Sequence, residues 1–138
     1  QFNLGVLYDT GRGVPRDLSI AVNWYRKAAH QGFAEAQFNL AQMYRQGEGA
    51  ERDAVQAVKW FLKAAKQSHV LSQFNLSLMY EQGVGVDKDD TAAADWCRKA
   101  AEQGHADAQY NLAQMYRLGQ GVPRDAAEAS KWFRRAAA

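Results

Sequence analysis

The feature that most constrains the fold is an internal repeat with a period of 36 residues. One eight-residue segment is written four times, as QFNLGVLY, QFNLAQMY, QFNLSLMY and QYNLAQMY, starting at Gln1, Gln37, Gln73 and Gln109. Recurrence at this density over a whole chain means that one supersecondary unit has been copied about four times. We therefore expect a single repeat domain over 1–138, with repeats at about 1–36, 37–72, 73–108 and 109–138.

Other residue types recur with the same period and predict two helices in each repeat. In the second repeat, the first helix is expected over Ala34–Gln46. Gly47 should end it, because glycine adopts the left-handed conformation without a side-chain clash. Asp53 stands where an N-cap belongs, so the second helix is expected over Ala54–Gln67. Asp125, followed three residues later by Glu128, has the spacing of a capping box.

Small residues recur at the positions where helices should meet. Ala57 and Ala64 stand in alanine columns that let helix axes approach closely, while Trp60, Phe61 and Leu40 should supply the apolar volume around them. One helix pair cannot bury both of its faces, so successive pairs must stack. The sequence therefore predicts an all-α protein, an α-solenoid of antiparallel helix pairs.

The repeated residues resemble a known family. The pattern A-x-A-Q-[FY]-N-L-x-x-M-Y-x-x-G-x-G-V-x-x-D, followed by A-x-x-W-[FY]-x-K-A-A-x-Q-G, is similar to the Sel-one-like repeat (SLR), a relative of the tetratricopeptide repeat. The resemblance covers essentially the whole chain. Two departures stand out: Ser68 replaces a glycine, and Cys97 replaces the aromatic residue that follows tryptophan in the other repeats. The resemblance implies a right-handed superhelix whose first helices line a concave groove for extended peptides.

One residue column on the predicted groove face is constant. A helical wheel puts Ala36, Leu40 and Met43 on the packing side of the first helix and Asn39 on the opposite side. An asparagine side chain offers both a donor and an acceptor, so it can pair with any peptide backbone. We hypothesise that the column forms a ladder for a ligand's main chain; it consists of Asn3, Asn39, Asn75 and Asn111. The alternative is that these amides bond internally and fix the stacking of the repeats.

The neighbours of the asparagines are expected to select the ligand's side chains. The predicted groove residues beside them are Phe38, Gln42, Arg45, Leu71, Phe74, Leu78, Tyr110 and Gln114. The aromatic members have packing between repeats as the favoured alternative. Leu71, Phe74 and Leu78 would form an apolar cluster in the third repeat, which is a common sign of a partner site. The alternative for Leu71 is burial at an irregular junction between the second and third repeats.

The sequence shows no signature of catalysis or of a cofactor. The three histidines have no metal-ligand spacing, and neither HExxH nor a CxxC pair is present, so we predict no metal site. Cys97 lies in a core column and is expected to be a small buried hydrophobe. No run of 18 apolar residues exists, so no membrane insertion is predicted. The net charge is only +2, and the basic residues are nearly balanced by acidic ones, so no nucleic-acid partner is expected.

These observations, together with the resemblance, predict a protein–protein interaction module, an adaptor or scaffold that binds an extended peptide or partner segment in its groove. The resemblance also implies that the protein is bacterial. The alternative is a structural spacer within a longer solenoid. The chain starts at Gln1 without a methionine and ends in three alanines, so we expect a piece of a longer protein. Because no polar capping element is visible, end-to-end self-association is a further expectation. The residues leave the cellular compartment open.

Overall fold

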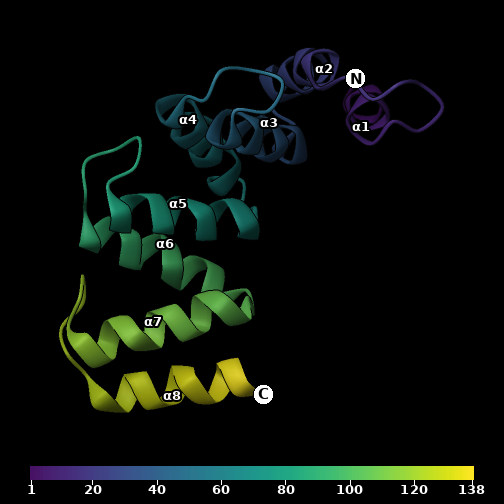
Figure 1. Cartoon of the computed structure of the whole chain (residues 1–138). Helices are drawn as coiled ribbons and strands as arrows, with labels where there is room; N and C mark the ends of the chain where they lie inside the picture. The colour runs from purple at the N-terminus through teal and green to yellow at the C-terminus, as the bar shows by residue number, and fades with distance from the viewer. The chain divides into compact units, whose positions relative to one another are not determined.

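The computed structural model describes all residues from Gln1 to Ala138, and it consists of α-helices joined by short loops (Figure 1). The helices are α1 (Phe2–Thr10), α2 (Leu18–His30), α3 (Ala34–Gln46), α4 (Ala54–Ala65), α5 (Val70–Gln82), α6 (Asp90–Glu102), α7 (Ala106–Leu118) and α8 (Ala126–Ala137). The all-α prediction is confirmed, and α3 has the bounds expected from the sequence.

The helices form two compact units. Unit 1 is Gln1–His69 and holds α1 to α4; unit 2 is Val70–Ala138 and holds α5 to α8. Within each unit the two helices of a repeat pack as an antiparallel pair, and the second helix of one repeat packs on the first helix of the next (Figure 1). The contacts between repeats are therefore those of α2 with α3 in unit 1 and of α6 with α7 in unit 2.

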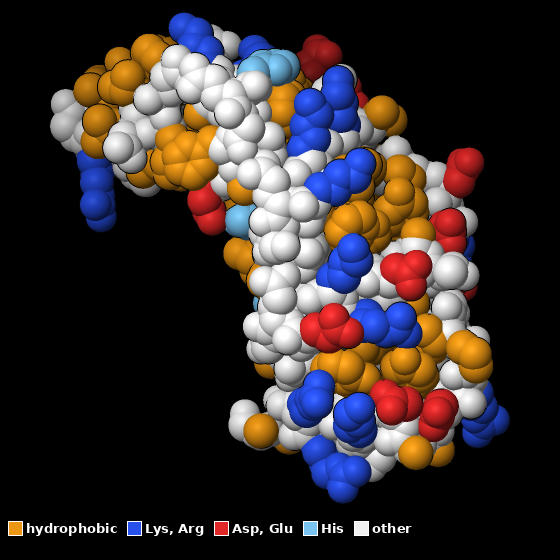
Figure 2. Space-filling view, turned by 180° about the vertical axis from the view of Figure 1, so that it is seen from behind, with side chains coloured by type: hydrophobic (Ala, Val, Ile, Leu, Met, Phe, Trp, Pro, Cys, Tyr) orange, Lys and Arg blue, Asp and Glu red, His pale blue; other side chains and the backbone are white.

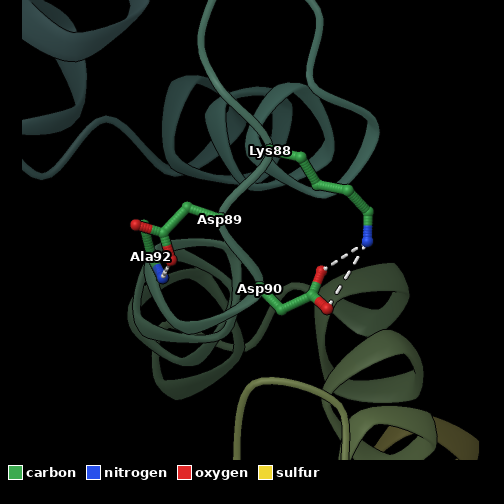
Figure 3. Close-up of polar contacts among 4 residues, drawn as sticks. All are labelled: Lys88, Asp89, Asp90 and Ala92. Carbon is green, nitrogen blue, oxygen red and sulfur yellow. Dashed lines mark hydrogen bonds and ion pairs between the residues drawn. The ribbon is translucent and has the colours of Figure 1, made fainter.

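Local hydrogen bonds explain where the helices begin. The Asp53 side chain accepts a hydrogen bond from the backbone N–H of Gln56 at 3.1 Å, as an N-cap should. Asp89 caps α6 in the same way, by accepting from the Ala92 N–H at 3.0 Å, while Lys88 pairs with Asp90 at the same turn (Figure 3). The aspartate column is thus a set of helix starts.

The predicted C-terminal end is confirmed for α3 but differs for α4. Gly47 follows α3 with φ of 73°, and its N–H bonds to the Met43 carbonyl. The second helix ends at Ala65 rather than at the predicted Gln67, because the chain tightens there: the Gln67 N–H bonds to the Ala64 carbonyl, three residues back. Ser68 then adopts φ of 65°, the left-handed conformation that favours glycine.

The second helices carry tryptophans whose rings are covered by basic side chains of the same helix. The Lys63 Nζ lies 4.9 Å from the centre of the Trp60 ring, and Lys99 lies equally far from Trp96. A cation over an indole face is attracted by the ring quadrupole. On the face shown in Figure 2, Lys and Arg side chains (blue) lie among hydrophobic side chains (orange), with Asp and Glu (red) between them. The basic residues near the helix ends therefore cover apolar surface as well as complementing the helix dipole.

Within each unit, the second glycine of the later G-x-G loop meets the preceding repeat. A Cβ added to Gly49 would overlap the carbonyl group of Leu18 and lie 2.8 Å from Val22 Cγ2, both on α2. A Cβ added to Gly13, in the first repeat, meets nothing within 4 Å. Gly49 and its unit 2 equivalent Gly121, whose added Cβ would overlap the Asp90 carbonyl group, are therefore required by packing between repeats as well as by the turn.

Gly49→Ala and Gly13→Ala form a matched pair that tests this contact. Both glycines have left-handed φ angles, 73° and 75°, so both variants carry a backbone cost of about 1–2 kcal/mol. Gly49→Ala should lower the free energy of unfolding by about 2 kcal/mol more, because its Cβ overlaps the backbone of α2. Urea denaturation followed by circular dichroism measures both losses. Equal losses would contradict the packing role.

Candidate interaction surface

All the predicted groove residues lie on the first helices of the repeats, α1, α3, α5 and α7. Each unit therefore has its own first-helix face, which we define as the side of these helices that carries the asparagine column. Unit 1 contributes Asn3, Phe38, Asn39, Gln42 and Arg45 to its face. Unit 2 contributes Leu71, Phe74, Asn75, Leu78, Tyr110, Asn111 and Gln114.

The asparagine column does not behave uniformly. The Asn39 side chain hydrogen-bonds to the hydroxyl of Tyr25, on α2 of the preceding repeat. Asn75 donates to the Leu71 carbonyl of its own helix at 2.8 Å. Asn111 is half-buried with no hydrogen-bond partner in the chain, and Asn3 is exposed. Internal bonding thus accounts for part of the column and leaves Asn111 available.

A glutamine column makes the buried polar contacts between repeats. Gln37 is 3% exposed, and its Nε2 donates to the Ala29 carbonyl near the end of α2 at 3.1 Å. Its Oε1 accepts from Gln67, which follows α4, at 2.9 Å. The Gln37 amide therefore joins three successive helical segments. The repeat pattern alone does not predict a role for this glutamine column.

Unit 2 repeats these bonds with equivalent residues. Gln109 donates to the Ala101 carbonyl at 3.1 Å, and Gln103 donates to the Gln73 side chain at 2.8 Å. Amides buried in this way fix the repeats against one another, because an unpaired buried polar group is costly. The stacking role considered for the asparagines is thus filled largely by the glutamines, two residues earlier in each repeat.

Gln37→Leu and Asn111→Ala should separate these two roles. Gln37→Leu keeps most of the side-chain volume but removes two internal hydrogen bonds, so the free energy of unfolding should fall by about 1–3 kcal/mol. Asn111→Ala removes no internal bond and should cost less than about 1 kcal/mol. Chemical denaturation compares the two variants. A larger loss for Asn111→Ala would show that the asparagine is the structural amide.

The aromatic column packs inside its own repeat. The Phe38 ring lies 5.9 Å from Phe61 and 4.9 Å from His69, measured between ring centres. Tyr110 lies 5.4 Å from Phe133 in an edge-on arrangement, but it remains 50% exposed. These rings therefore contribute to packing, and Tyr110 also presents an open face.

The polar residues beside the asparagine column differ in how far they already interact within the chain. The Arg45 guanidinium lies 5.8 Å from the Phe61 ring centre, and burial lowers its pKa. Gln42 is half-buried, and its Oε1 is shielded from solvent without a hydrogen-bond partner. Gln114 donates to the Tyr110 hydroxyl at 3.3 Å and accepts from Arg117 Nε at 2.8 Å.

Apolar surface on the unit 2 face is substantial. Leu71 is 46% exposed and Tyr110 is 50% exposed, while Phe74 and Leu78 are half-buried. Leu71 is thus not sequestered, although it stands next to the irregular Ser68 turn. The face offers apolar groups with amides between them.

A cavity of about 160 Å³ opens between α5 and α7 on the same face. It is lined by Leu78, Glu81, Gln82, Asn111, Gln114, Met115 and Gln120. The structure thus brings three predicted residues together: Leu78, Asn111 and Gln114. Glu81, Gln82 and Gln120 are not among the predicted groove residues, although the departure from the repeat pattern at Cys97 is a signal that this repeat differs.

Cys97 itself is 1% exposed, so the prediction of a small buried hydrophobe is confirmed. Its Sγ lies 3.2 Å from the Ala108 carbonyl oxygen, and burial raises the pKa of the thiol to about 12. Because the thiolate is the nucleophilic form, burial lowers the reactivity of Cys97 at neutral pH. No group of three or more His, Cys, Asp or Glu side chains is placed to hold a metal ion. None of the helices has the length and apolar character to cross a membrane.

Comparison with known proteins identifies the family. The Sel1 repeat matches the chain in four consecutive copies, at residues 1–33, 34–69, 70–105 and 106–138. Each copy holds one complete helix pair, and the copies follow the same 36-residue period as the predicted repeats with a different starting phase. The chain belongs to the Sel1 repeat family. No curated protein matches it.

Solved structures with the same fold come from several bacteria. A protective antigen of uropathogenic Escherichia coli that displays an SLR fold is 40% identical, with a TM-score of 0.97 over 99% of this chain. A Sel1 repeat protein from Oxalobacter formigenes is 37% identical, with a TM-score of 0.88 over 98% of this chain. The chain spans 29% and 55% of those two proteins. Helicobacter pylori cysteine rich protein B is 25% identical, with a TM-score of 0.65, and the match covers 92% of this chain and 91% of that one.

These matches confirm the solenoid class that the repeats predicted. Proteins of the Sel1 repeat family commonly mediate protein–protein interaction, and the fold is in general a non-catalytic scaffold.

Proposed function

We propose that the chain is an adaptor segment that holds an extended peptide of a partner protein on its first-helix faces. The observation that carries the proposal is the combination of exposed Leu71 and Tyr110 with the unpartnered Asn111 amide on the unit 2 face. Apolar side chains supply binding energy as they leave water. An amide with a free donor and acceptor can pair with a peptide backbone.

The asparagines contribute unequally in this proposal. Asn111 and Asn3 bind the ligand main chain directly, because neither has an internal partner. Asn39 and Asn75 already make internal bonds, so they contact the ligand with the hydrogen-bonding capacity that those bonds leave. The side chains of Phe74, Leu78 and Tyr110 select apolar residues of the peptide.

The test is a selection of 12-residue peptides displayed on phage against the purified chain, followed by fluorescence anisotropy with the peptides obtained. Peptides of this kind should bind in the micromolar range, on the order of −8 kcal/mol. Leu71→Ser should weaken binding about tenfold or more, because it removes a large apolar contact. Val55→Ser is the matched control, since Val55 is 65% exposed on a second helix, α4.

Loss of binding in Leu71→Ser with full binding in Val55→Ser supports the proposal. If no peptide is selected, or if Val55→Ser is as damaging as Leu71→Ser, the first-helix faces are not the binding surface. Thermal melting of both variants verifies that each is folded.

A second candidate function is end-to-end association, and particular side chains at the two terminal helices favour it. A cavity of about 420 Å³ lies along α8, and its lining consists of small residues, Phe133 and the two arginines Arg117 and Arg134. Leu4 on α1 is 39% exposed, whereas the equivalent Leu40 and Leu112 are fully buried against the second helix of the preceding repeat. We propose that the side of α1 that carries Leu4 docks on α8 of a second copy.

Sedimentation equilibrium tests this association. The chain should form concentration-dependent oligomers, and Leu4→Lys should make it monomeric because a charge would enter an apolar contact. Asn3→Lys, an exposed position one residue away, is the control and should leave association unchanged. A wild-type chain that stays monomeric at high concentration would contradict this second function.

A further inference from the structure

We propose that the cavity between α5 and α7 in unit 2 is a receptor for one lysine or arginine side chain of the bound partner. The inference rests on the proposed function, since it gives that function a defined specificity.

The lining of the cavity combines one carboxylate, several amides and an apolar floor. Glu81 is its only charged lining residue, and it is half-buried and forms no ion pair or hydrogen bond within the chain. Amide groups from Gln82, Asn111 and Gln120 surround it, while Leu78 and Met115 are the apolar members. At about 160 Å³, the cavity has room for on the order of five water molecules, which is the size of one long side chain.

This composition favours a basic side chain. Lysine and arginine only donate hydrogen bonds and carry a positive charge, which matches a carboxylate and amide oxygens. Their aliphatic stems pack on apolar surface while the charged end reaches polar groups. A ligand carboxylate would meet the charge of Glu81, and an apolar side chain would leave Glu81 desolvated and unpaired. The nearby cations are already engaged: Arg117 binds Gln114, and Arg98 donates to the Tyr116 hydroxyl at 2.8 Å.

Unit 1 shows what fills the equivalent position when the site is closed. There the Tyr25 hydroxyl donates to Asp9 Oδ2 at 3.0 Å and also bonds to Asn39. With the 36-residue period applied twice, Asp9 corresponds to Glu81 and Asn39 to Asn111, both of which line the cavity. The first repeat thus carries its own hydrogen-bond donor between the acid and the amide.

Unit 2 lacks that donor because Cys97 stands where Tyr25 does. A thiol in the core cannot span the distance that a tyrosine covers, and Cys97 bonds instead to the Ala108 carbonyl. The neighbouring position changes as well: a Cβ on Gly5 would lie 2.7 Å from the Tyr25 ring, so glycine is required beside the tyrosine, whereas unit 2 has Ser77 there. The paired change leaves Glu81 and Asn111 open to a donor from outside the chain.

The test uses single-residue probes on the whole chain, observed by NMR through side-chain and backbone amide signals. The probes are Nα-acetyl-arginine methylamide and Nα-acetyl-lysine methylamide, with the norleucine and citrulline analogues as neutral controls. We expect dissociation constants on the order of 1 mM for the basic probes, with shifts at Asn111 and Gln114, and at least tenfold weaker binding for the neutral ones. Equal binding of neutral and basic probes, or shifts confined to other residues, would overturn the proposal.

Two variants define the chemistry of the site. Glu81→Gln should abolish the preference for basic probes, whereas the matched control Glu102→Gln, on the exposed surface of α6, should leave it unchanged. Ser77→Gly combined with Cys97→Tyr reproduces the arrangement of unit 1 and should remove probe binding while Glu81 is still present. If the double variant does not fold, the comparison of Glu81→Gln with Glu102→Gln decides the proposal alone. A basic preference that survives Glu81→Gln would overturn it.

Failure here is distinguishable from failure of the proposed function. Selected peptides that bind in a manner dependent on Leu71, but without any preference for lysine or arginine, would leave the adaptor function standing and remove only the basic receptor. The single-residue probes do not depend on Leu71, so a basic preference in the cavity can also be detected without any selected peptide.

Discussion

The contact on which the rest of the structure depends is the packing of a first helix against the second helix of the preceding repeat. Alanine columns let the two backbones approach, and glycine in the following loop removes the Cβ that would obstruct them. A close approach of this kind buries main-chain carbonyls at the helix ends. The Gln37 and Gln109 amides reach those carbonyls, so that buried polar groups are paired where the repeats meet.

This arrangement has a consequence for recognition. Because the glutamines carry much of the bonding between repeats, the asparagines two positions later are less constrained by stability. Asn39 is still drawn into a bond with Tyr25, but Asn111 is not, because its repeat neighbour is Cys97. A substitution in the core of one repeat thereby changes which polar groups are available on the surface of the next. Within a nearly uniform repeat, specificity arises from such local departures from the pattern.

Much of the fold was predictable because a residue type that recurs with a fixed period marks the same structural position in every repeat. The 36-residue period predicted the helix pairs, the Asp53 cap, the Gly47 end and the buried alanine positions, all of which depend on local sequence. Of the tryptophans, Trp60 and Trp132 are buried, whereas Trp24 and Trp96 are half-buried. The end of α4 was misplaced because a tightened final turn depends on Ser68 adopting a left-handed angle. The role of Gln37 was missed because a polar residue beside the packing face of a helical wheel gives no sign of the carbonyl it will meet.

The candidate site was less predictable because it depends on contacts between different helices. Helical position identified Asn111, Gln114 and Leu78, but only the packed structure shows that Glu81 joins them around a cavity. Whether an amide is occupied internally depends on a side chain from another helix, as Tyr25 and Cys97 illustrate.

The measurement that tests the central claim most directly is hydrogen exchange of individual side-chain amides, followed by NMR on the unmodified chain. The account predicts strong protection of the Gln37 and Gln109 amide protons, because both groups are buried and donate to main-chain carbonyls. It predicts rapid exchange for Asn3 and Asn111. Rapid exchange of the glutamine amides, or protection of Asn111 as strong as theirs, would contradict the division between structural glutamines and available asparagines.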